Sequence, residues 1–222
     1  MIDGAEPEPA KVEVFMDFHC PYSYRAVCWL DELPAGIVDV RHRLFALEQV
    51  NRDPDAASWR IWEQPLDYVH YRDRPDRRGL AAFLATAVVE AGLDGDAARR
   101  LRRAIYEARF ETALDISDPD VLDAAGVTAG LPVGWIRGAL LDDSRTGPAR
   151  ERLARDWAAA RSPFLVFGVP TLAFADEAPV YLRLEAAVPP SEGTAFLGAL
   201  RAFRRAAPGV LELKQPDPAV PS

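Results

Sequence analysis

The hydrophobic pattern of the chain opens with a strand that leads into a helix. Apolar and polar side chains alternate over residues 12–18, which predicts a β-strand, and Phe15 makes both faces apolar, as is typical of a central strand. After Cys20 the period becomes helical, because Pro21 suits a first helical turn and apolar residues follow on one face: Ala26, Val27, Leu30 and Leu33. Cys20 is therefore predicted to lie at the junction of the strand and the helix.

The remaining pattern predicts another strand, a long helical region and a hairpin. A second strand is expected over residues 37–44. Residues 53–161 have helical spacing, too long a stretch for a simple crossover between strands. Two short runs, 171–175 and 180–184, are separated by acidic residues and a proline, which predicts a hairpin. A final amphipathic helix contains Phe196, Leu197, Leu200 and Phe203.

Cys20 is the residue with the clearest chemical use. As the cap of the predicted helix it would face free N–H groups and the positive end of the helix dipole, which favours the thiolate and lowers a cysteine pKa. Ser23, three residues on, is placed to point its hydroxyl at the sulfur. The alternative is a buried and inert cysteine, since free cysteine is among the most buried residue types.

The second cysteine, Cys28, is too far along the helix to pair with Cys20. Eight helical residues separate their Cα atoms by about 12 Å. A disulfide tolerates a Cα separation of only about 7 Å, so an intact helix excludes a bridge. We predict that Cys28 packs in the core.

Two short motifs resemble a known family. The run DFHCPYSY at residues 17–24 resembles the active-site entry of the DsbA-like branch of thioredoxin-fold proteins, and FGVPTL at residues 167–172 resembles the loop that contains their cis-proline. The resemblance implies an α/β, thioredoxin-like fold with a large helical insertion. It implies a thioredoxin-like domain of residues 10–52 and 162–214 and a helical insertion domain of residues 53–161. The proline-rich residues 215–222 are expected to form a mobile tail.

The chain departs from this family at the second cysteine of the C-P-x-C motif, where it has Ser23. Thiol exchange that resolves itself needs a second thiol beside the first, and position 23 offers none. The resulting monothiol C-P-Y-S motif is also similar to the S-P-Y-S run of kappa-class glutathione transferases and to 2-hydroxychromene-2-carboxylate isomerases. Ser23 alone does not decide which relative is nearer.

The resemblance implies roles for the residues of both motifs. Cys20 would be the nucleophile of a thiol-disulfide oxidoreductase, forming mixed disulfides with a protein or small thiol, while Ser23 hydrogen-bonds the thiolate. Val169 and Pro170 would position the partner, Pro170 through a cis peptide bond. His19, Pro21 and Tyr22 complete the expected thiol-binding surface; His19 would favour the thiolate when protonated, or simply face solvent.

Two other functions remain open at this stage. One is a thiol-dependent transferase or isomerase, in which Cys20 or Ser23 activates a bound thiol. The other is a non-catalytic thioredoxin-like module for redox sensing or binding. In each case no bound cofactor is expected, and glutathione or another low-molecular-weight thiol is the expected co-substrate.

Composition and charge limit the classes of molecule that we expect the protein to bind. A chain of 222 residues with 49% hydrophobic content can bury a sizeable core. Its net charge of -8 gives no reason to expect binding to nucleic acid or to an anionic membrane. Three histidines without Cys/His spacing make a metal site unexpected. The oligomeric state is open, a homodimer included.

Two local basic runs stand out against this acidic background. Arginines occur at positions 72, 74, 77 and 78 and again at 99, 100, 102 and 103. We interpret them as solvated helix faces; the alternative is that one of them holds a carboxylate of a tripeptide-like thiol.

The first residues and the apolar runs of the chain indicate the cellular compartment in which we expect the protein. Residues 1–7 lack the charged and apolar regions of a secretory signal, and no run approaches the roughly 18 apolar residues of a membrane helix. A cytoplasmic protein is therefore expected, which favours a reduced and reactive Cys20 over a structural disulfide.

Overall fold

The computed structural model describes residues 9–52, 58–210 and 212. Its centre is a four-stranded sheet of order β2-β1-β3-β4. Strand β1 (Ala10–Met16) pairs in parallel with β2 (Val38–Leu44) and antiparallel with β3 (Thr171–Phe174), which pairs antiparallel with β4 (Val180–Tyr181). A helix joins the parallel pair, so the predicted α/β arrangement is confirmed.

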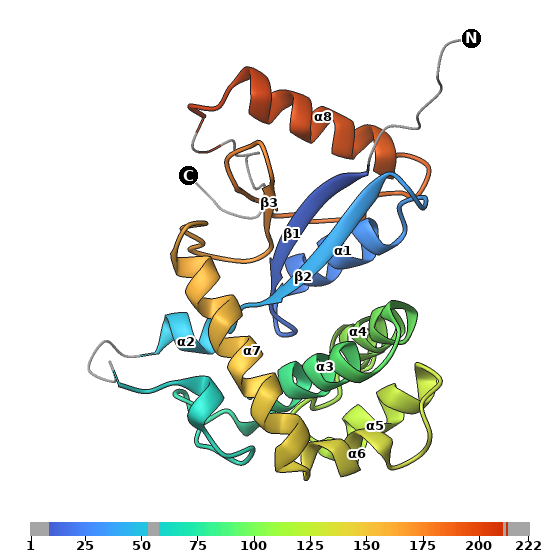
Figure 1. Cartoon of the computed structure of the whole chain (residues 1–222), viewed down its shortest axis with the longest axis vertical. Helices are drawn as coiled ribbons and strands as arrows, with labels where there is room; N and C mark the ends of the chain where they lie inside the picture. The colour runs from blue at the N-terminus through green and yellow to red at the C-terminus, as the bar shows by residue number, and fades with distance from the viewer. Residues whose placement is uncertain (1–8, 53–57, 211, 213–222) are drawn as a thin grey trace, which may run out of the picture.

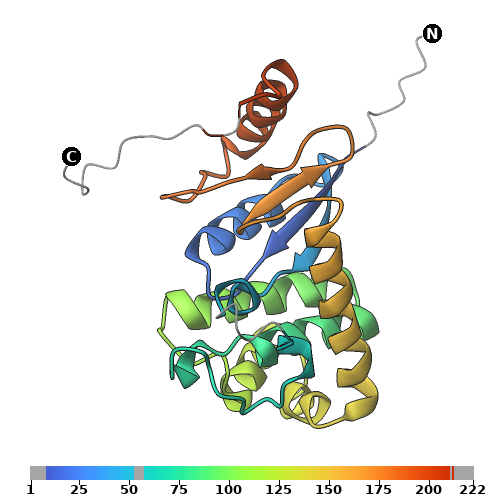
Figure 2. The same ribbon diagram turned by 90° about the vertical axis from the view of Figure 1, so that its left-hand side faces the viewer.

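Several of the helices form a second layer at one end of this sheet. The helix bounds are α1 (Pro21–Asp31), α2 (Leu47–Asn51), α3 (Leu80–Gly92), α4 (Gly95–Phe110), α5 (Pro119–Thr128), α6 (Trp135–Leu140), α7 (Asp143–Arg161) and α8 (Gly193–Ala206), with short 3-10 turns η2 (Ile61–Glu63) and η3 (Pro75–Arg77). Helices α3 to α6 gather on one side, α8 lies at the opposite end, and the sheet with α1 lies between them (Figures 1 and 2).

Helix α3 is the centre of the helical layer. Every side chain from Leu80 to Val89 is buried, and the helix packs against α4, α6 and α7. A helix that is apolar all round needs neighbours on every side, which explains why the insertion contains several helices. Helix α7 then runs back from this layer to the sheet (Figure 1).

The contact between α7 and the sheet is polar and buried. Asp156 on α7, which is 2% exposed, accepts a hydrogen bond from the Leu44 N–H at 3.1 Å and another from Arg43 at 2.9 Å. Arg152, one turn earlier, donates to the His42 carbonyl at 3.1 Å. Both backbone groups belong to β2, so α7 is hydrogen-bonded along the edge of that strand.

Several predicted boundaries shift in the structure. The second strand begins at Val38 instead of residue 37, and the second arm of the hairpin is a strand only at Val180–Tyr181. Three of the predictions concern residues outside the described ones. These are the absence of a secretory signal at residues 1–7, the start of the insertion at residue 53 and the mobile tail at residues 215–222. The division into domains at residues 52/53 and 161/162 stays a prediction.

None of the helices in the described part of the chain combines the length and apolar content that a bilayer span requires.

Candidate active site

Cys20 occupies the N-cap position of α1. Its backbone is extended, with φ -98° and ψ 114°, and Pro21 follows at the start of the helix. The Cys20 N–H donates to the Asp17 carbonyl at 3.1 Å, while its own carbonyl accepts from Tyr24 at 3.1 Å and so begins the helical ladder. The sulfur is thus held at the end of the helix where backbone N–H groups have no helical partner.

The Cys20 sulfur contacts the second motif, residues 167–172, directly. Cys20 Sγ donates a hydrogen bond to the Val169 carbonyl at 3.3 Å, across 149 positions of sequence. The Val169–Pro170 peptide bond is cis. Cys20 is 5% exposed and Val169 3% exposed, and both belong to a small apolar cluster on this side of the sheet. The structure therefore brings the two motifs together.

Ser23 lies beneath the sulfur and is fully buried. Its hydroxyl oxygen accepts from the Asp17 N–H at 3.4 Å, which leaves the hydroxyl hydrogen free to turn toward a thiolate. Burial raises the pKa of the Cys20 thiol above its ordinary value, although the Ser23 hydroxyl and the N–H groups of Ser23 and Tyr22 oppose this shift. The structure thus differs from the lowered pKa that the sequence predicts, because desolvation outweighs the helix terminus.

Asp17 is a buried acid that sequence reasoning missed. Its carboxylate accepts from the His19 N–H at 2.6 Å and from the Leu47 N–H at 2.7 Å. Burial raises the pKa of Asp17 to about 6, and its negative charge adds to the raised pKa of Cys20. The residue lies within the DFHCPYSY run, but a single acidic residue in a strand pattern gives no sign that it is buried.

Three further residues were assigned to the thiol-binding surface from the first motif. Pro21 occupies the first helical position, and Tyr22 lies partly exposed beneath the guanidinium of Arg183, whose Cζ is 4.8 Å from the ring centroid. Burial lowers the pKa of His19 to about 4. His19 is therefore neutral at physiological pH and cannot favour the thiolate through a positive charge.

The loop that approaches Cys20 also presents apolar side chains to solvent. Leu165 is 77% and Phe167 71% exposed, and the Phe167 ring lies 5.2 Å from the ring of Tyr181. Burial and then the nearby Cys20 charge raise the pKa of Tyr181, which places its phenol near the sulfur. Sequence reasoning missed Tyr181, because its role depends on how β4 folds back against the loop.

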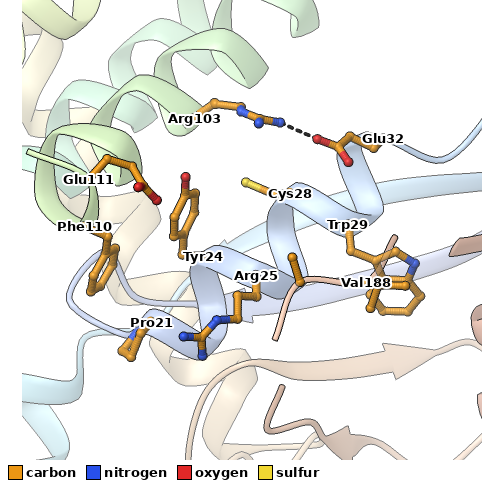
Figure 3. Close-up of a pocket in the computed structure, with 11 residues that line it drawn as sticks. Pro21, Tyr24, Arg25, Cys28, Trp29, Glu32, Arg103, Phe110, Glu111 and Val188 are labelled. Atoms are coloured by element: carbon orange, nitrogen blue, oxygen red, sulfur yellow. Dashed lines mark hydrogen bonds and ion pairs between the residues drawn. The ribbon is translucent and has the colours of Figure 1, made fainter. Parts of the chain in front are cut away.

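Cys28 is not a core residue, contrary to the prediction. It is half-buried and lines a surface pocket of about 370 Å³ beside α1. In Figure 3 its thiol faces this pocket between Tyr24 and the ion pair of Arg103 with Glu32. Burial raises the pKa of Cys28 to about 12. Both cysteines are free, so the predicted absence of a bridge holds.

Across residues 9–52 and 58–210, no three His, Cys, Asp or Glu side chains gather in an arrangement that could hold a metal ion.

Comparison with solved structures shows proteins of similar fold. Among solved structures, cytosolic disulfide reductase DsbM from Pseudomonas aeruginosa with GSH has a TM-score of 0.59 and 18% identity over 86% of this chain and 99% of that one. The same protein without GSH gives a TM-score of 0.58 and 19% identity, over 87% and 99% of the two chains. A protein from Nitrosomonas europaea, described as a candidate disulfide isomerase, gives 0.56 and 13%, over 90% and 99%.

No curated protein sequence matches the chain. The model of the DSBA-like thioredoxin domain, however, matches residues 11–191, which include both motifs and the helical layer between them. The predicted fold class is confirmed by this match and by the shared fold of the solved structures. The chain belongs to the DSBA-like thioredoxin domain family of thiol-disulfide oxidoreductases.

Proposed function

We propose that the protein is a monothiol thiol-disulfide oxidoreductase that uses Cys20 as its nucleophile. The Cys20 thiolate attacks one sulfur of a disulfide, forms a mixed disulfide and releases the other half as a thiolate. A thiolate from outside the protein attacks the Cys20 sulfur of the mixed disulfide, releases the second half of the substrate as a thiolate and remains bonded to Cys20. A second outside thiolate attacks this bound thiol, forms a disulfide with it and frees the Cys20 thiolate. Two electrons therefore pass from two outside thiols to the original disulfide, and the protein ends unchanged.

The observation that carries this proposal is the contact between Cys20 Sγ and the Val169 carbonyl at 3.3 Å. It sets the sulfur against the cis-proline loop, whose backbone groups can bind an incoming chain or small thiol alongside it. Ser23 supports the same step, because its hydroxyl can donate to the thiolate once the thiol proton has left. His19, Pro21, Tyr22 and Pro170 surround the two sulfur atoms in the mixed disulfide.

Glutathione or a similar small thiol is the proposed resolving partner, and no bound cofactor is required. Cys28, the other cysteine, lies eight residues along an intact helix and its pKa is about 12. A related fold, the DsbM structure, was solved with GSH and is described as cytosolic, which supports both a glutathione partner and a cytoplasmic setting.

The test measures reduction of insulin and of bis(2-hydroxyethyl) disulfide by glutathione. Wild type and Cys28→Ala are expected to react alike, whereas Cys20→Ala loses activity. Mass spectrometry of wild type quenched with acid should detect glutathione on Cys20. Equal losses in both variants would refute the assignment of the nucleophile.

A thiol-dependent transferase or isomerase is the second candidate. The pocket that Pro21, the residue after Cys20, helps to line also contains Tyr24 and Phe110, and these rings suit an aromatic electrophile. Consumption of an aromatic electrophile only when a thiol is added would favour this candidate over disulfide exchange.

A redox-sensing module without catalysis is the third candidate, and the raised pKa of Cys20 favours it. An unactivated thiol is a poor nucleophile at neutral pH. The pH dependence of Cys20 alkylation in the Cys28→Ala background separates the candidates, since a titration at or below pH 7 supports catalysis and one above pH 8.5 supports the module.

A further inference from the structure

A pocket of about 370 Å³ follows helix α1 away from the active site. Pro21, the residue after Cys20, lines it at the start of the helix, and Glu32 lines it at the other end. Phe110 and Glu111, at the C-terminal end of α4, complete the wall that faces α1 in Figure 3. The volume lies within the range of small-molecule sites, so a small ligand can bind here with one end at the first turn of α1.

The middle of the pocket is aromatic. The rings of Tyr24 and Phe110 stack with their centroids 5.6 Å apart and their planes 9° apart, and Trp29 lines the same pocket. The aliphatic side chain of Val188, from the segment after β4, adds to these rings. Such walls contact the uncharged body of a ligand, and the charged residues of the pocket then determine which end groups it can have.

The charges at the far end of the pocket are already compensated. Of the arginines in the two basic runs, Arg103 lines the pocket, and it pairs with Glu32 at 2.6 Å and with Glu107 at 2.9 Å. An arginine held by two carboxylates is not expected to bind a third. The alternative that Arg103 holds the carboxylate of a peptide-like thiol is therefore disfavoured.

Arg25 is the uncompensated cation of the pocket. Its Nη1 donates to the Leu184 carbonyl at 2.7 Å, and its Cζ lies 5.8 Å from the ring centroid of Tyr22, next to the active site. Among the residues that the structure describes, no carboxylate forms an ion pair with it. A guanidinium has five N–H donors and the Leu184 carbonyl uses one, so the remaining donors can bind a carboxylate.

Glu111 is the matching anion. It is exposed at the C-cap of α4, and no basic side chain within residues 9–52 or 58–210 pairs with it. In Figure 3 its carboxylate lies beside the Tyr24 ring, whereas the Arg25 guanidinium extends toward Pro21. The two charges therefore line one pocket without neutralising each other. The last carbonyls of α4 also favour a cation at this point.

We propose that this pocket binds a short peptide thiol that carries both a carboxylate and an ammonium group. Arg25 binds the carboxylate, Glu111 binds the ammonium, and the thiol reaches past Pro21 to Cys20. The inference rests on the proposed exchange reaction and specifies the class of thiol that resolves it. A small neutral thiol makes neither ionic contact, so it should be the poorer partner.

The first test measures binding without exchange. S-Methylglutathione has both charges and no free thiol, and isothermal titration calorimetry gives its Kd for the wild-type chain. Arg25→Gln should weaken binding about tenfold, and Glu111→Gln, at an exposed position, about threefold. Arg99→Gln and Glu151→Gln, which change charges in exposed ion pairs outside this pocket, should leave the Kd unchanged. No binding to the wild type, or one Kd for all five proteins, would overturn the proposal.

The second test assigns each charge to its partner. Glutathione diethyl ester lacks the carboxylates, and N-acetylglutathione lacks the ammonium. Arg25→Gln should raise the KM for glutathione about tenfold with kcat unchanged, and should not alter the KM for the ester. Glu111→Gln should raise the KM for glutathione about threefold and leave the KM for N-acetylglutathione unaltered.

Equal changes of KM for glutathione and its matched derivative would refute the two ionic contacts. If Arg25→Gln impairs folding through loss of its bond to Leu184, the exposed variant Glu111→Gln still decides the outcome. Binding of S-methylglutathione that depends on both charges, in a protein that exchanges no disulfide, would refute the proposed function and leave the pocket assignment intact. Exchange that depends on Cys20, together with no binding of S-methylglutathione, would do the reverse.

Discussion

The two cysteines of this chain share one helix and differ in almost everything that determines reactivity. Cys20 caps the start of α1, where the N–H groups of Tyr22 and Ser23 are free to approach its sulfur. Cys28 lies inside the same helix, where the neighbouring N–H groups are used by the helical ladder. Position along a helix, rather than residue type, thus decides which thiol can be stabilised as a thiolate.

The charges around the two sulfurs sharpen the difference. Burial is the largest cause of the raised pKa at both. Around Cys28 the acids Asp31, Glu32 and Glu107 raise the pKa further, and the Arg103 charge opposes them. Around Cys20, the Asp17 carboxylate raises the pKa of the thiol, and hydrogen bonds from Ser23 and Tyr22 lower it. Burial raises the pKa of both thiols, and hydrogen bonds to the sulfur limit this increase at Cys20.

The largest expected effect is the inertness of Cys28. Because its pKa is about 12, roughly three units above the ordinary value of 9.0, its alkylation at pH 7.5 should be about a thousandfold slower than that of an unperturbed cysteine. The measurement is iodoacetamide labelling of Cys20→Ser followed by mass spectrometry. Rapid labelling of Cys28 would erase the contrast between the two sites.

Ser23→Cys should sharpen the contrast by supplying a resolving thiol next to Cys20 only. Residues three apart at a helix start lie within the reach of a disulfide. Release of a mixed disulfide should become independent of added thiol and about a hundredfold faster, because the attack is intramolecular. Stopped-flow decay of a glutathionylated sample reports the rate, with Ser144→Cys, on an exposed helix end, as the control.

Ser23→Ala should weaken Cys20 without touching Cys28. Loss of the hydroxyl donor raises the pKa of the Cys20 thiol, so alkylation at pH 7.5 should slow about tenfold. The pH-rate profile in a Cys28→Ala background gives the shift directly. An unchanged profile would mean that the backbone N–H groups alone support the thiolate.

The smallest effect is expected from Asp17→Asn. The pKa of Asp17 is about 6, so above pH 6 its ionised carboxylate raises the pKa of Cys20. Asparagine has no such charge, and alkylation at pH 7.5 should accelerate about threefold, with no difference below about pH 5, where Asp17 is protonated. Asp31→Asn is the matched control, since it should affect Cys28 and leave Cys20 unchanged.

The pH dependence of the free energy of unfolding provides a second measurement of the pKa of Asp17. The folded pKa of Asp17 is raised from 3.8 to about 6, so the folded state retains its proton longer than the unfolded chain does. Its contribution to the free energy of unfolding is therefore present below pH 3.8 and is lost as the pH rises through 6. Asp17→Asn should remove that part of the pH dependence.

What the sequence predicts well is local. Pro21 and the change of hydrophobic period fix the strand, turn and helix around Cys20, and the second motif brings Val169 and Pro170 to the same place. Asp118 at the start of α5 is another local signal, because its side chain accepts from the Asp120 N–H and Pro119 follows it in the first turn of the helix.

What the sequence does not predict depends on packing between distant segments. The side of α1 that carries Cys28 faces a pocket that is also lined by Arg103 and Phe110 of α4, a helix distant in sequence. The lowered pKa of His19 depends on burial and on the charges of Arg109 in α4 and Arg77 in η3, which lie far from it in the sequence. The raised pKa of Cys20 likewise arises from burial by the cis-proline loop, which no pattern around residue 20 reveals.

The buried polar contact between α7 and β2 has a consequence for solubility. Strand β2 is the last strand on its side of the sheet, and such an edge exposes N–H and C=O groups that can recruit a strand from another molecule. Arg152 and Asp156 occupy the outward groups of His42 and Leu44. The helix that links the two layers therefore also blocks the C-terminal part of this edge from intermolecular β-pairing, a route to aggregation.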